Sequence, residues 1–120
     1  MTTTYELGFV LSVLGAFPLL ASGVMFILHH PSVVKNMTHL GFEVGQMRAL
    51  GVVKILIAIL TLVPATSFVG VILATGWMGG AIASHLRVRD AFVIQAIVPL
   101  LIWIGFGMRH EAQMRALLGV

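Results

Sequence analysis

The sequence contains no cysteine, and among its 120 residues only four are acidic and seven are lysine or arginine. Without a thiol, the chain cannot carry out disulfide exchange or thiolate catalysis, and it cannot form a cysteine-ligated metal site. The few basic residues stand at the ends of apolar runs. They form no basic patch with interleaved aromatic side chains, so the sequence does not indicate nucleic-acid binding.

Charge of either sign is scarce, because charged residues make up 9% of the chain and hydrophobic residues 59%. Soluble domains carry roughly 25% charged residues, and a soluble domain of this length could not cover so much apolar surface. The bilayer is therefore the expected solvent and membrane lipid an expected partner. The first residues include Glu6 and no basic residue, which argues against a cleaved signal peptide. We expect a multi-pass protein of the bacterial inner membrane.

Four apolar runs predict four transmembrane helices, at about residues 7–28, 47–63, 66–86 and 91–108. A helix crosses the roughly 30 Å hydrocarbon core in about 20 residues. The stretch between the first two runs is too polar to span and predicts a short amphipathic helix in the interface, with Ser32 as N-cap and Gly41 at its end. The expected fold is an all-α, integral membrane four-helix bundle that forms a single domain over residues 1–120.

The third run contains small residues at every fourth position, at Gly76, Gly80 and Ser84. This small-xxx-small spacing is typical of close contact between membrane helices. We therefore expect the third helix to lie at the centre of the bundle. The turn at Pro64 is so short that the second and third helices must form an antiparallel hairpin.

Four alternating spans bring the first and third connections to the same side of the membrane. Most ionisable side chains should gather there, namely His29, His30, His39, Glu43, His85, Arg87, Arg89 and Asp90. Lys54 falls near mid-membrane in the second run. A lysine at that depth is either a functional group or one whose long stem reaches the near interface, and both interpretations stay open.

Proton transfer is the chemistry that His85 and Lys54 suggest, together with Asp90 or Glu43 as the carboxylate. The alternative for His85 is a hydrogen-bonded residue at the end of a helix. No H-x₃-H or E-x-x-H spacing occurs, and the adjacent His29 and His30 face different directions on a helix. Neither a metal site nor a haem is therefore expected.

Three segments carry a resemblance to a known family: HPSVVKNMTHLG, RALGVVKILIAILTLVP and TGWMGGAIASHLRVRD. Together they resemble the DoxX-like small membrane proteins over nearly the whole chain. The resemblance implies a four-helix membrane bundle. The family name comes from a subunit associated with a thiosulfate:quinone oxidoreductase, which suggests a quinone as a ligand. By match to the motifs, the resemblance singles out His39, His85, Arg87 and Asp90. Lys54 stands where many family members carry glutamate.

Three functions are compatible with these residues. The first is a site for a hydrophobic small molecule, with a quinone as one candidate, serving an oxidoreductase system. The second is a cofactor-free membrane isomerase or hydrolase that acts on a lipophilic substrate. The third is a non-catalytic assembly or stabilising subunit, either self-associating or bound to a partner membrane protein. The predicted catalytic residues are His85, Lys54 and Asp90, and the predicted ligand-binding residues are His39, Arg87, Trp77 and Gln95.

Overall fold

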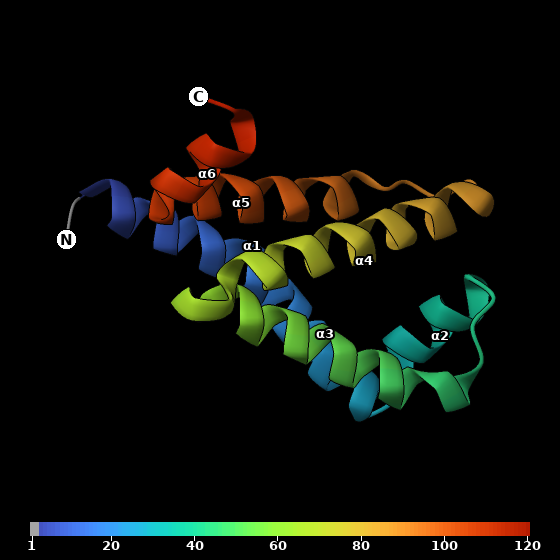
Figure 1. Cartoon of the computed structure of the whole chain (residues 1–120). Helices are drawn as coiled ribbons and strands as arrows, with labels where there is room; N and C mark the ends of the chain where they lie inside the picture. The colour runs from blue at the N-terminus through green and yellow to red at the C-terminus, as the bar shows by residue number, and fades with distance from the viewer. Residues whose placement is uncertain (1–2) are drawn as a thin grey trace.

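The computed structural model describes residues 3–120, and every regular element in that range is helical (Figure 1). The predicted domain also includes residues 1–2, which lie outside the described residues. In chain order the elements are α1 (Thr3–Ile27), α2 (Pro31–His39), the 3₁₀ turn η1 (Val44–Gln46), α3 (Met47–Leu62), the 3₁₀ turn η2 (Pro64–Thr66), α4 (Ser67–Arg87), α5 (Val93–Arg109) and α6 (Glu111–Leu118).

Three of these helices are long and apolar enough to cross a membrane: α1, α3 with its preceding turn, and α4 with its preceding turn. The fourth, α5, has 17 residues and so reaches about 25 Å. It continues into α6 after a bend of 111°, and only together are the two helices long and apolar enough for a fourth span, either broken at the bend or re-entrant. The predicted all-α membrane bundle is thereby confirmed. Both ends of the described chain and the α3–α4 turn lie at one end of the bundle, and α2 lies at the other (Figure 1).

The helix at the centre of the bundle is α1, which packs against both α3 and α5. Glycines allow the close approach on each side. A Cβ atom at Gly15 would lie 2.6 Å from Cγ1 of Ile102 on α5, and one at Gly23 would lie 2.9 Å from the carbonyl oxygen of Gly51 on α3. The prediction that the third span lies at the centre is therefore wrong, and the first span takes that place.

The small residues of α4 explain the error. A Cβ atom at Gly76, Gly79 or Gly80 would meet no atom within 4 Å among the described residues. Close helix contact occurs instead near the start of α4, where Gly70 meets the backbone of Thr61 on α3. From that point α3 and α4 diverge toward the end that holds α2 (Figure 1). The volume that small residues leave open on α4 is thus free for something other than a neighbouring helix of this chain.

The contrast between these glycines yields a first prediction. Gly70→Ala should lower the free energy of unfolding by about 2 kcal/mol, because the new methyl group would collide with backbone that cannot move independently. Gly79→Ala is the matched control and should be neutral or stabilising by up to about 1 kcal/mol, since alanine favours the helix and meets open space. Unfolding by SDS in mixed micelles measures both. Equal effects of the two substitutions would contradict the close α3–α4 contact.

The short helix α2 begins differently from the prediction. Its N-cap is His30, whose Nδ1 accepts a hydrogen bond from the Ser32 N–H at 3.3 Å. The predicted Ser32 cap is wrong because Pro31 occupies the first helical position and places Ser32 inside the first turn. The predicted end is confirmed: Gly41 has a φ of 94°, the left-handed conformation that terminates a helix. Met37 of α2 is buried in a small core with Phe26.

Candidate functional site

A cavity of about 670 Å³ lies in the half of the bundle where α3 and α4 diverge. That volume falls in the range of roughly 300–1,000 Å³ that is typical of small-molecule sites. Every helix except α6 contributes to the wall. The lining includes Leu19 and Phe26 of α1, Asn36 of α2, Lys54 of α3, Gly76, Trp77, Met78, Gly80 and His85 of α4, and Gln95 and Val98 of α5. The predicted site residues Lys54, Trp77, His85 and Gln95 therefore share one cavity.

Lys54 lies at the midpoint of α3 and lines the cavity. Its Nζ atom is 4.1 Å from the centroid of the Phe26 ring and 6.0 Å from that of the Trp77 ring. An ammonium group is attracted to the faces of such rings by their quadrupole. The aromatic wall thus holds the amine at the surface of the cavity, within reach of a bound molecule.

His85 lines the same cavity near the end of α4. Its Nδ1 atom lies 2.7 Å from the Ala81 carbonyl oxygen, which can only accept, so Nδ1 carries the hydrogen of that bond. The other ring nitrogen, Nε2, lies 3.4 Å from the side-chain nitrogen of Gln95, which donates to it. Gln95 and Ala81 together hold the imidazole in a fixed orientation.

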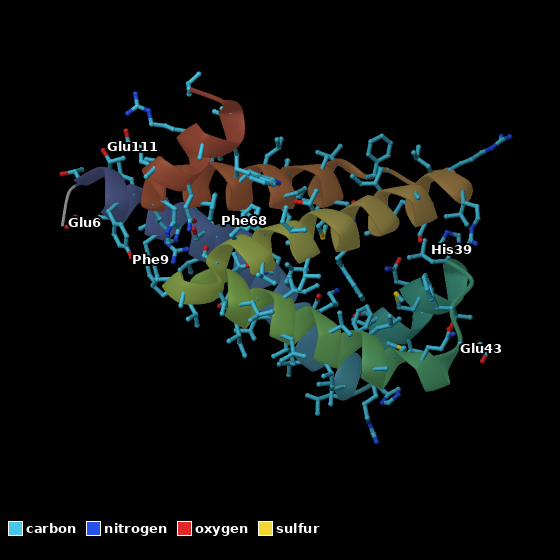
Figure 2. All side chains as sticks on the ribbon, viewed as in Figure 1. Glu6, Phe9, His39, Glu43, Phe68 and Glu111 are labelled. Carbon is cyan, nitrogen blue, oxygen red and sulfur yellow. The ribbon has the colours of Figure 1, made fainter. Side chains whose placement is uncertain are left out.

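The remaining predicted residues lie outside the cavity lining and connect α2 to the end of α4. The Asp90 carboxylate lies 3.0 Å from Nε2 of His39 (Figure 2). This contact is at the wide end of the bundle, the end that holds α2 and toward which α3 and α4 diverge (Figure 1). The Arg87 guanidinium donates to the Leu40 carbonyl, the C-cap of α2. Asp90 therefore has His39 as its side-chain partner, and the imidazole of His85 is bonded elsewhere. An acid–base pair of His85 with Asp90 would require this connection to open.

Sequence reasoning missed Arg109 at the end of α5. It follows an apolar run, as a charge at the end of a span does, but it is only 6% exposed. Its guanidinium donates to the Ser12 hydroxyl at 3.1 Å and to the carbonyl oxygens of Thr61 at 3.2 Å and Leu62 at 2.9 Å. It thereby joins α1, α3 and α5 at the end of the bundle opposite to the cavity.

The sequence signal that could have found Arg109 is Pro64, which follows the end of α3. Pro64 has no N–H, so the carbonyls that end α3 need donors from other parts of the chain. Thr66 and Ser67 supply hydroxyl donors to Leu60 and Thr61, at 2.9 Å in each case. The Leu62 carbonyl receives its hydrogen bond from Arg109.

The fold and the cavity define a multi-pass integral membrane protein of the four-helix bundle class. The model of the DoxX-like family matches residues 10–106, and the chain belongs to that family. The match includes every residue that lines the cavity and stops before Arg109. Neither a curated protein nor a solved structure matches the chain. The family assignment confirms the resemblance in the sequence motifs, and the functional roles of the site residues stay predictions.

Proposed function

We propose that the protein binds a hydrophobic small molecule in the cavity between α3 and α4. The observation that carries the proposal is the wall itself: apolar side chains such as Leu19 and Val98 surround a few convergent polar groups. This combination is typical of sites that orient a ligand by its polar head and bury its apolar body. Lys54 and Gln95 supply the donors for that head.

A quinone is one member of this class, because its carbonyl oxygens accept hydrogen bonds and its tail is apolar. The link to an oxidoreductase system, and a place in the bacterial inner membrane, follow from what the family resemblance implies. We propose both on that basis, with the whole chain acting as a single transmembrane domain. The absence of cysteine means that any electron transfer would involve the ligand and a partner, and no thiol of this chain.

Extraction of gently purified protein tests the proposal. Mass spectrometry of the organic extract, with an absorbance spectrum of the protein, should reveal a defined lipophilic molecule in the wild type. Lys54→Met and His85→Ala should reduce the amount of that molecule, because each removes a polar group from the cavity wall. Lys35→Met is the matched control, since Lys35 is an exposed residue of α2. An empty wild-type protein, or bound lipid that ignores both substitutions, would contradict the proposal.

A stabilising subunit is the second candidate, and one feature of α4 favours it. Gly79 and Ala83 are exposed, four residues apart, and a Cβ at Gly79 would meet nothing within 4 Å in the described chain. Such a face allows close approach of another membrane helix. Co-purification of a stoichiometric membrane partner that Gly79→Leu abolishes would support this candidate, and a protein that purifies alone would count against it.

A further inference from the structure

The cavity contains a cation and no acidic side chain. The whole chain has four acidic residues, and none of them lines the cavity. The Asp90 carboxylate has the His39 imidazole as its partner, at 3.0 Å. Glu6 and Glu111 lie at the opposite end of the bundle from His39 (Figure 2).

The fourth acid, Glu43, is exposed and stands at the start of η1. Its backbone N–H is bonded to the Gln46 side chain at 3.0 Å, and in Figure 2 it lies at the outer edge of the wide end. None of the four acidic side chains therefore lies beside Lys54. The ammonium group at the middle of a membrane span has aromatic rings as neighbours and no counter-ion from its own chain.

The positive charge of Lys54 is therefore not balanced by a negative charge of this chain. An ammonium group removed from water loses hydration that contacts with two aromatic rings restore only in part. A negatively charged partner restores far more, because the attraction between opposite charges is strong where water is scarce. Lys54 lines the cavity, so a bound molecule is well placed to supply that charge.

We propose that the ligand of this cavity is a lipophilic carboxylic acid with a single apolar chain. This inference rests on the proposed function of the cavity and specifies its ligand class. The carboxylate pairs with the Lys54 ammonium group, and the Gln95 amide provides a further donor on the same wall. A carboxylate is an acceptor with a full negative charge, whereas a quinone carbonyl accepts a hydrogen bond but leaves the ammonium charge unbalanced.

The size and lining of the cavity fit the rest of such a molecule. Leu19, Val98 and Met78 line the cavity as apolar wall on three different helices. The volume of about 670 Å³ is that of a site for one ligand of moderate size, which suits one acyl chain better than a two-chain phospholipid. The small residues Gly76 and Gly80 leave room beside the α4 backbone.

The chain contains its own reporter for the test. It has two tryptophans, and Trp77 lines the cavity whereas Trp103 bonds to Thr75 at 2.8 Å. Trp103→Phe therefore leaves a protein whose tryptophan fluorescence comes from the cavity wall alone. The probes are dibromostearate and its methyl ester, since bromine quenches tryptophan only at short range. Both are titrated into the protein in dodecyl maltoside micelles.

We expect saturable quenching of Trp77 by dibromostearate, with an apparent Kd about tenfold below that of the methyl ester. One charge-assisted hydrogen bond, which only the acid can form with Lys54, accounts for a difference of this size. Lys54→Met should raise the Kd of the acid to that of the ester and leave the ester unaffected. Lys54→Arg keeps the charge and should keep part of the preference. Lys35→Met, which alters an exposed lysine, should behave like the parent protein.

The outcomes separate this inference from the proposed function. Equal binding of acid and ester in the parent protein would overturn the carboxylate assignment and leave the cavity as a site for a neutral ligand. That comparison needs no substitution at Lys54, so a misfolded variant cannot obscure it. Quenching that never saturates, with either probe, would overturn the inference together with the proposed function.

Discussion

Arg109→Met is expected to lower the free energy of unfolding by about 4.5 kcal/mol, because three hydrogen bonds from a charged donor are lost and each contributes roughly 1.5 kcal/mol. The Leu62 carbonyl would also lose the donor that the structure gives it. SDS titration in mixed micelles, followed by the loss of helix signal in circular dichroism, measures the change. We expect the midpoint to shift far more than for any exposed charge of this chain.

Arg115→Met is the control for Arg109, since Arg115 is an exposed arginine on α6. Its substitution should change the free energy of unfolding by less than about 0.5 kcal/mol. Arg109→Lys should fall between the two, because a single ammonium group cannot reproduce the spread of guanidinium contacts to Ser12 and two carbonyls. If Arg109→Met unfolds at the same midpoint as Arg115→Met, the buried contacts contribute nothing to stability.

The fold class was predictable because hydrophobic runs of sufficient length have few alternatives to a membrane helix. The topology of four spans also placed Lys54 and His85 in the same half of the bundle, and both line the cavity. Neither conclusion needed the rotation of a helix about its axis. Length, charge and chain order were enough.

The rest depended on rotation and on neighbours, which a single sequence does not specify. Arg109 ends an apolar run in the same way as a charge that marks the membrane boundary, and only the orientation of α5 turns it inward. Gly76 and Gly80 have the spacing of a helix contact, but spacing identifies a face and not its occupant. In the structure that face is part of the cavity wall.

A larger side chain on the face of α4 that lines the cavity should remove ligand binding without unfolding the protein. Gly80→Leu is expected to weaken binding of dibromostearate and of its methyl ester by about 100-fold, since forcing a side chain into occupied volume costs about 3 kcal/mol. The substitution should not destabilise the protein, because leucine favours a helix over glycine and a Cβ at Gly80 meets no atom within 4 Å. Trp77 quenching measures the affinity, and SDS titration measures the stability.

Gly79 provides a control one residue away. It has the same open surroundings but does not line the cavity, so Gly79→Leu should give the same gain in helix stability and leave the affinity unchanged. The pair separates loss of cavity volume from any general effect of leucine in α4. A fall in affinity of similar size for both variants would mean that ligand binding depends on the flexibility of α4. A loss of affinity in Gly80→Leu alone would show that the ligand lies beside Trp77, in the cavity that Lys54 also lines.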